Sequence, residues 1–269
     1  MKQFVLLLVI VFVAGCIGGE PYTESIAVPD HGGMAAANES VSIETHSGEA
    51  IVRWEYDREA SEWKPRGDPP ECPAVVMQTP VDIDIATSIL YPGQERTGDY
   101  KPHGGFRFDN SDNAIEVRAP FDGYMFRGSR SLSNGEIQYS LDVVHPCGIV
   151  YRLGHILELP PKWAAVAEKF REPTEGDTRT TEVEPVRVET GEVLATKVGL
   201  ENNVFVDWGV YDLRQRNEAS QDPAWAAERG GEHASYALCW FELLPPDDEQ
   251  AVRALPPADG TMGTTSDYC

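Results

Sequence analysis

The segment Tyr100-Lys-Pro-His-Gly-Gly-Phe-Arg-Phe-Asp109 and, shortly after it, Ile115-Glu-Val-Arg-Ala-Pro-Phe-Asp-Gly123 decide the predicted fold. Each is a short run of mixed apolar and polar residues that ends at turn-forming residues, as short β-strands do. Further tight turns are predicted on both sides of these segments, at Pro92-Gly93, Asn134-Gly135 and Thr190-Gly191. We therefore predict a mainly β fold, an antiparallel β-sandwich or barrel-like domain.

Four other segments have the pattern of regular elements. Residues 49–56 and 81–85 alternate apolar and polar side chains, so we predict a strand at each, the first covering an edge of the main sheet. Residues 161–170 and 222–229 favour helix and carry proline in the first turn. These two segments predict short helices inserted between strands.

The quoted segments resemble the opening of the lysostaphin/LytM-type zinc peptidase domain, the duplicated hybrid motif. That opening reads H-x-G-x-D and then a strand and turn ending A-P-x-x-G. Residues 137–151 and 186–199 resemble strand pairs that follow in the family. Its members cut peptide cross-links of cell walls with a zinc ion held by two histidines and one aspartate. The resemblance implies a LytM-like β-domain over residues 46–255, with its core at 75–245 and a groove across one face.

The resemblance also assigns the site positions, and most of them are changed. His103 occupies the first zinc-ligand position, whereas Arg107 stands where the aspartate belongs. Phe205 and Asp207 replace the two histidines of the last motif, H-x-H-F, and His155 is the candidate catalytic histidine. An arginine cannot ligate zinc, so the resemblance implies a degenerate site that holds no metal.

Two hypotheses follow for the changed positions. In the first, an Arg107–Asp207 ion pair holds the strands where zinc once held them, because a guanidinium and a carboxylate pair in a fixed geometry. In the alternative, zinc is bound by His103, Asp207 and either His145 or His155, and the chain is a zinc endopeptidase with altered ligands. Another alignment of the last motif, at residues 238–242, also lacks both histidines.

The leading interpretation is a domain without peptidase activity that binds through the old groove. Phe106, Tyr151 and Trp208 are the aromatic residues expected to line that groove. Members of the family with degenerate sites act by binding partner enzymes. The expected ligand is a cell-wall or envelope component, or a partner protein.

The first residues predict export and lipid attachment. Lys2, a short apolar run and Val13-Ala-Gly-Cys16 are typical of a lipoprotein signal peptide over residues 1–16, with a lipid on Cys16. Residues 17–45 are polar and lack periodicity, so they predict a flexible tether. Residues 256–269 are similarly polar and Gly-rich, and predict a loose tail unless Cys269 ties it down. We expect an extracytoplasmic protein that is attached to the membrane through its lipid.

Charge and cysteines limit the partners and the compartment. The formal net charge of −22 repels nucleic acid, which we exclude as a partner. Four cysteines remain besides Cys16, and an even number in an exported chain predicts disulfides. The expected pairs include Cys72–Cys147 or Cys147–Cys239.

Overall fold

The computed structural model describes residues 51–109, 112–133 and 135–269. The predicted signal peptide (1–16), the lipid attachment at Cys16 and the tether (17–45) lie outside these residues. No helix within the described ranges is long and apolar enough to cross a membrane.

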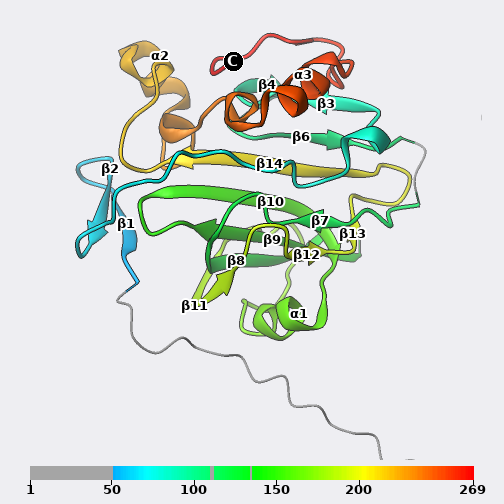
Figure 1. Cartoon of the computed structure of the whole chain (residues 1–269), viewed down its shortest axis with the longest axis horizontal. Coiled ribbons are helices and arrows are strands. Elements are labelled where there is room, and N and C mark those ends of the chain that lie inside the picture. Colours follow the sequence, from blue (N-terminus) through cyan, green and yellow to red (C-terminus); the bar gives the residue numbers. More distant parts are fainter. Residues whose placement is uncertain (1–50, 110–111, 134) are drawn as a thin grey trace, which may run out of the picture. The chain divides into compact units, whose positions relative to one another are not determined.

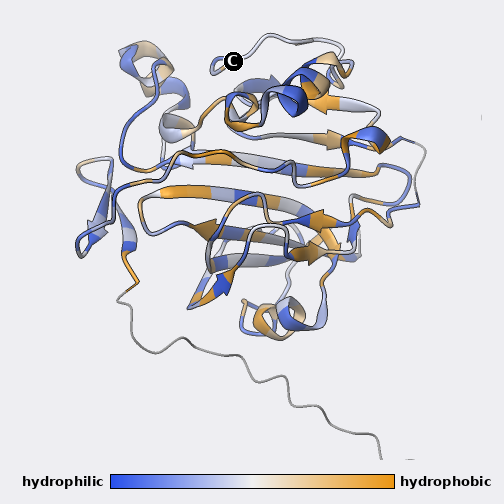
Figure 2. Ribbon diagram, viewed as in Figure 1, coloured by the Kyte–Doolittle hydropathy of each residue, from blue (hydrophilic) through white to orange (hydrophobic). Residues whose placement is uncertain are grey.

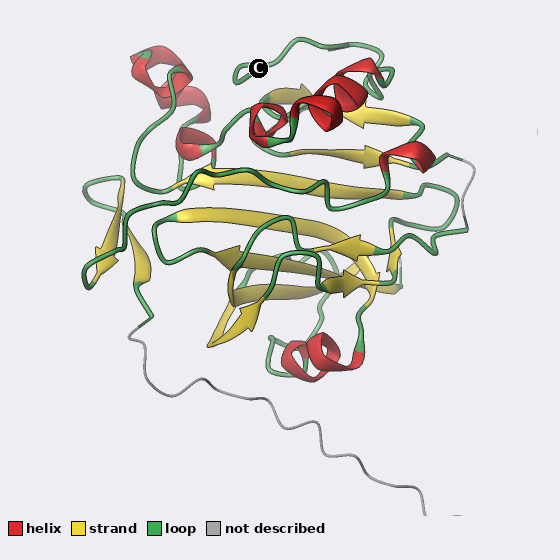
Figure 3. Ribbon diagram, in the orientation of Figure 1, coloured by secondary structure: helices red, strands yellow, loops and turns green. Residues whose placement is uncertain are grey.

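The fold is mainly β and is dominated by one antiparallel sheet, as the turn pattern predicts. Figure 1 shows its strands side by side across the domain, and Figure 3 separates them from the helices. The spatial order is β11 (Thr181–Val188), β8 (Gly123–Ser133), β9 (Glu136–Val144), β10 (Ile149–Glu158), β14 (Phe205–Asp212), β6 (Gly104–Arg107) and β3 (Ser88–Leu90), with β13 (Lys197–Val198) also paired to β10. Since β11 and β3 end this order without pairing to each other, the sheet is not a closed barrel.

Within the residues that the structure describes, three small two-stranded sheets accompany the main sheet. They are β1 (Arg53–Asp57) with β2 (Glu62–Arg66), β4 (Gln94–Arg96) with β5 (Asp99–Lys101), and β7 (Val117–Arg118) with β12 (Val193–Ala195). The strand predicted at residues 49–56 therefore pairs within its own hairpin, through Arg53–Asp57, rather than with an edge of the main sheet.

Both predicted helices are present, and a third was missed. They are α1 (Pro161–Ala167), α2 (Pro223–Arg229) and α3 (Pro246–Ala254), and short 3-10 segments lie at η1 (Ile83–Ile85), η2 (Ala219–Gln221), η3 (Ala234–Tyr236) and η4 (Trp240–Leu243). Each α-helix begins with proline, and the Asp222 side chain caps α2 by accepting from the backbone N–H of Ala224.

The strand predicted at residues 81–85 is wrong. The Asp82 side chain accepts from the backbone N–H of Asp84 and turns the chain into the 3-10 segment η1. Aspartate competes with strand pairing through this kind of local hydrogen bond. The alternation of these five residues was therefore not a strand signal.

The two faces of the main sheet differ in chemistry, which is why the strand ribbons alternate between hydrophobic and hydrophilic colours in Figure 2. Leu153, Val206 and Trp208 point to one face and are fully buried in the main hydrophobic core. The other face carries polar residues at the alternate positions, such as Ser140 on β9 and Asp207 on β14. This polar face holds the candidate site.

Two disulfides join the chain, Cys72–Cys147 and Cys239–Cys269. The first is one of the expected pairs, and the second replaces the other expectation, Cys147–Cys239. The C-terminal segment is consequently not loose. Besides the disulfide, it is held where Ile89 donates its backbone N–H to Pro256 and accepts from that of Ala258. Structural disulfides are typical of chains that fold outside the cytoplasm.

Candidate functional site

A cleft of about 740 Å³ lies over the polar face of the sheet. Its lining comes from the middle strands β8, β9, β10, β14 and β6, and from the segments beside β4 and the C-terminal tail. Three of the predicted site residues, His103, His155 and Asp207, lie together in it. Arg107 and Phe205 also line the cleft.

Asp207 is the centre of this group. The ring nitrogen Nε2 of His103 lies 3.0 Å from Asp207 Oδ2, and Nε2 of His155 lies 3.4 Å from the same oxygen. In the sheet, Asp207 stands between Gly105 on β6 and Gly154 on β10. Because neither neighbour has a side chain, the two histidines reach the carboxylate from both sides.

Gly105 is also required by the backbone. A Cβ added there would collide with the carbonyl oxygen of Val206 on β14. The close approach of β6 to β14 that brings His103 to Asp207 therefore depends on a residue without a side chain.

A β-bulge aims His155 into the cleft. The register between β9 and β10 shifts between Leu153 and Ile156, and both of these side chains are fully buried. His155 sits in the bulge with φ of 58°, in the left-handed region that non-glycine residues rarely adopt. The extra residue re-aims the imidazole toward Asp207, a frequent use of bulges at functional sites.

Hydrogen bonds fix the tautomer of His155. Gln138 Nε2 donates to the carbonyl oxygen of Gly199 at 2.6 Å, and this sets the amide orientation because a carbonyl can only accept. Gln138 Oε1 then faces His155 Nδ1 at 2.7 Å, so this nitrogen carries a hydrogen and donates. The other nitrogen, Nε2, is left facing Asp207. A proton or a metal ion would be held between these two atoms.

Asp207 is ionised in this arrangement. Burial alone would raise the pKa of its carboxyl, but the facing imidazoles of His103 and His155 outweigh burial and hold the pKa well below the ordinary value. The site therefore contains a permanent carboxylate whose partners are two histidines.

The donor atoms suit zinc in type but not in arrangement. Zinc bound at 2.0–2.2 Å in tetrahedral geometry keeps its donor atoms roughly 3.3 Å apart. The two histidine-to-Asp207 separations, 3.0 and 3.4 Å, are close to this. However, among the residues that the structure describes, no group of three or more His, Cys, Asp or Glu side chains is placed to hold a metal ion. We therefore assign no reaction step to a metal here.

The predicted Arg107–Asp207 ion pair is wrong. Arg107 Nη2 donates to Asn203 Oδ1 at 2.5 Å, and its Nε lies 3.5 Å from Asp109. In the sheet Arg107 is paired with Phe205, two residues from Asp207 along β14. Asp207 instead faces the two histidines, which the resemblance assigned as ligand and catalyst.

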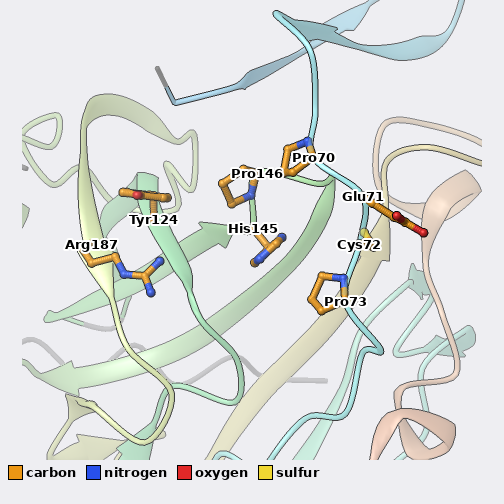
Figure 4. A pocket seen from close by; sticks show the side chains of 8 residues that line it. All are labelled: Pro70, Glu71, Cys72, Pro73, Tyr124, His145, Pro146 and Arg187. Atoms are coloured by element: carbon orange, nitrogen blue, oxygen red, sulfur yellow. The ribbon is translucent and has the colours of Figure 1, made fainter. Parts of the chain in front are cut away.

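His145 is excluded from the site. It lies in a separate, shallow hollow with Tyr124, Pro146 and Arg187, shown in Figure 4. The β10 end beside it pairs Ile149 with Asp212, five residues along β14 from Asp207. At about 3.3 Å per residue this is roughly 16 Å, too far for a shared ligand. Of the two histidines proposed to complete a zinc site, only His155 is in place.

The expected groove aromatics belong to the core. Phe106 and Trp208 are fully buried, Tyr151 is 1% exposed, and none of the three lines the cleft. The reason is strand alternation, because Trp208 follows Asp207 and must point to the opposite face. The rings that do line the cleft are Tyr100, Tyr139, Phe205 and Tyr211.

Sequence reasoning missed a charged cluster at one end of the cleft. Asp142 is completely buried, and its Oδ2 accepts from Arg127 Nε at 2.6 Å while Arg152 lies 3.6 Å from its Oδ1. His233 Nε2 lies 2.9 Å from Arg127 Nη2. Burial, then Arg127, lowers the pKa of His233 to about 3, so it is neutral and accepts this bond. The available signal was a charged residue directly between apolar neighbours, such as Asp142 between Leu141 and Val143 and Arg152 between Tyr151 and Leu153.

The chain matches no protein-family model, no curated protein and no solved structure. The LytM-type resemblance therefore rests on the motif residues alone, and the site must be interpreted from its own geometry.

Proposed function

We propose that this chain is a lipid-anchored, extracytoplasmic domain of LytM-like ancestry without peptidase activity. It binds a component of the cell wall or envelope in the cleft over its main sheet. The lipid on Cys16 and the tether after it place the domain at the membrane surface. The two disulfides support the extracytoplasmic location.

One observation carries this proposal. Asp207, at the floor of the cleft, lies 3.0 Å from His103 Nε2 and 3.4 Å from His155 Nε2, so the residues at the old metal positions contact one another. A peptidase of this kind needs a metal to polarise the amide and to activate water. Because the residues at the metal-ligand positions contact one another, we assign no peptidase activity to the cleft. Its remaining capacity is to bind an envelope component.

Filling the cleft tests the binding function. Gly154 has ordinary space beside Asp207, so Gly154→Gln places a side chain in the cleft without a backbone collision. We expect this variant of the full-length, detergent-solubilised protein to bind envelope material at least about tenfold more weakly, a loss of about 1.4 kcal/mol. Gly231→Gln is the control, because an added Cβ there meets nothing within 4 Å. Equal binding by wild type and Gly154→Gln in a sedimentation assay would exclude the cleft.

The second candidate is a zinc endopeptidase with His103, Asp207 and His155 as ligands. It is favoured by the Gly199–Gln138–His155 chain of hydrogen bonds, because metal-bound histidines usually donate their other ring N–H to such a partner. This function requires the ring nitrogens of His103 and His155 to reach one zinc ion together with the Asp207 carboxylate.

Metal content decides between the two candidates. We expect the full-length protein, purified without chelator, to contain no stoichiometric zinc, and His103→Ala to make no difference. His145→Ala is the matched control, since His145 lies outside the cleft. Stoichiometric zinc that His103→Ala abolishes and His145→Ala retains, measured by elemental mass spectrometry, would establish the endopeptidase instead.

A further inference from the structure

The cleft reverses the charge balance of the protein. The whole chain has 22 Lys and Arg residues against 44 Asp and Glu residues. The charged residues that line the cleft, apart from histidine, are Arg96, Lys101, Arg107, Arg152, Asp207 and Asp259. Cations therefore outnumber anions two to one in the cleft, in a protein where the reverse holds overall. A cationic side chain that lines a cleft without a carboxylate in contact attracts anionic ligands.

Both acids of the cleft are already occupied. Asp207 is bonded to two histidines. Asp259 Oδ1 accepts the backbone N–H groups of Thr261 and Met262, which uses it to form a turn. Lys101 and Arg107 are paired with acids beside the cleft, Asp99 and Asp109, so Arg96 and Arg152 are the cations left to contact a ligand.

Arg96 is the clearest case of an unmet positive charge. It is only 8% exposed, is the last residue of β4 and lines the cleft. Its Nη2 donates to the carbonyl oxygen of His103 at 2.6 Å, whereas its Nε is buried without a partner. Within the described residues it forms no ion pair. Asp207 and Asp259 offset the burial of this charge without contacting it, so an anion in contact with the guanidinium would be favoured further.

Arg152 provides a second cationic contact. Asp142 is shared between Arg127 and Arg152, so one carboxylate faces two guanidinium groups and a positive charge remains. The Arg152 side chain is 25% exposed. Its side chain lines the cleft.

The rest of the lining suits a hydroxylated ligand. Sites for apolar ligands are lined predominantly by hydrophobic side chains. Here the lining includes hydroxyl and amide groups from Ser129, Ser131, Gln138, Ser140 and Asn203. Half-buried rings, Tyr100, Tyr139 and Phe205, supply flat surfaces beside them. Sugars present hydroxyls at their edges and apolar C–H groups on their ring faces, which matches this combination.

A peptide fits less well. Extended peptides add to a sheet by pairing with an exposed strand edge. The cleft lies over β9, β10 and β14, whose backbone groups are already paired with neighbouring strands. No free strand edge runs along its floor, so the cleft cannot recognise a peptide by strand addition.

We propose that the cleft binds an acidic sugar, a uronate-bearing oligosaccharide whose carboxylate is held by Arg96 and Arg152. This rests on the proposed envelope-binding function and names the chemical class of its ligand.

The test measures binding of tri-galacturonate, its methyl ester and neutral maltotriose to the full-length protein by calorimetry. We expect tri-galacturonate to bind, the methyl ester to bind about tenfold or more weakly, and added salt to weaken the binding of the acid. We expect Arg96→Gln to reduce affinity for the acid by about 10- to 100-fold, the value of one charge-assisted contact. Arg53→Gln is the charge-matched control, because Arg53 is 58% exposed and lies outside the cleft.

Arg152→Gln tests the same proposal if Arg96→Gln fails to fold, and we expect a loss of similar size. Equal affinity for the acid and its methyl ester would overturn the inference, as would tighter binding of succinate or of a wall tripeptide. Envelope binding that tri-galacturonate does not compete would also overturn it, while leaving the proposed function intact. Failure of the protein to bind envelope material at all would instead reject the proposed function.

Discussion

Replacing Asp142 with Asn is expected to destabilise the folded protein by about 3–5 kcal/mol, because it leaves two guanidinium groups without their shared carboxylate. Asp142 is completely buried, and the Arg127 side chain that contacts it is 10% exposed. Asn preserves the shape of the side chain, so the loss reports the charge rather than a cavity. Denaturant unfolding of both proteins at pH 7 measures it.

The pH dependence of this loss is a second readout. Burial alone would raise the pKa of Asp142, but Arg152 and Arg127 reverse the effect and hold it below the ordinary value of 3.8. A depressed folded pKa contributes stability above the unfolded pKa, and that stability is lost as pH falls through the folded pKa. The difference between wild type and Asp142→Asn should stay constant from pH 8 to about pH 5 and shrink below about pH 4.

Asp99→Asn is the matched control, since Asp99 is 73% exposed and pairs with Lys101 at 3.2 Å. We expect it to cost less than about 1 kcal/mol, as exposed ion pairs do. An Asp142→Asn loss no larger than that of the control would mean that the buried cluster does not hold β8, β9 and β10 together.

The architecture was predictable because its signals are local. Turn residues such as Asn134-Gly135, and the alternation of apolar and polar residues along a strand, are signals that span only a few residues. These signals predicted the antiparallel sheet. Helices α1 and α2 also followed from local composition, with proline at each start. The segment at residues 81–85 failed because one Asp side chain formed a local hydrogen bond that alternation does not report.

The site was only partly predictable because it depends on contacts between distant strands. The resemblance nominated His103, His155 and Asp207, and these residues do come together. It could not show that Arg107 is paired with Phe205 rather than with Asp207, since that depends on the register of β6 against β14. Nor did spacing reveal the bulge that turns His155 toward the cleft.

Face assignment caused the remaining errors. The aromatic residues Phe106, Tyr151 and Trp208 were expected in the groove because they neighbour site residues in sequence. Phe106 and Trp208 directly adjoin Arg107 and Asp207, and adjacent strand positions point to opposite faces. Tyr151 lies four residues before His155, and the bulge between Leu153 and Ile156 leaves the two on different faces. Counting alternation outward from Asp207 assigns Trp208 to the core and Phe205 to the cleft.

Removing the Cys72–Cys147 disulfide is expected to destabilise the protein by about 4 kcal/mol, because the bond closes a long loop in the unfolded chain. The two cysteines are 75 residues apart, whereas Cys239 and Cys269 are 30 apart. The logarithmic dependence on loop length makes the longer loop worth about 0.8 kcal/mol more. Denaturant unfolding of the paired Cys→Ala variants should therefore rank Cys72/Cys147 as the more costly loss.

For ligand binding we expect the opposite order, with loss of Cys239–Cys269 weakening binding more than loss of Cys72–Cys147. Cys239–Cys269 ties down the C-terminal segment, and Ala258 and Asp259 of that segment line the cleft. Hydrogen bonds to Asp267 from Tyr100 and Trp225 also hold this segment, so its release is a local change. Loss of Cys239–Cys269 should weaken envelope binding at temperatures where the sheet is still folded. If its removal lowers stability more than that of Cys72–Cys147 and leaves binding unchanged, the segment is part of the core rather than a wall of the site.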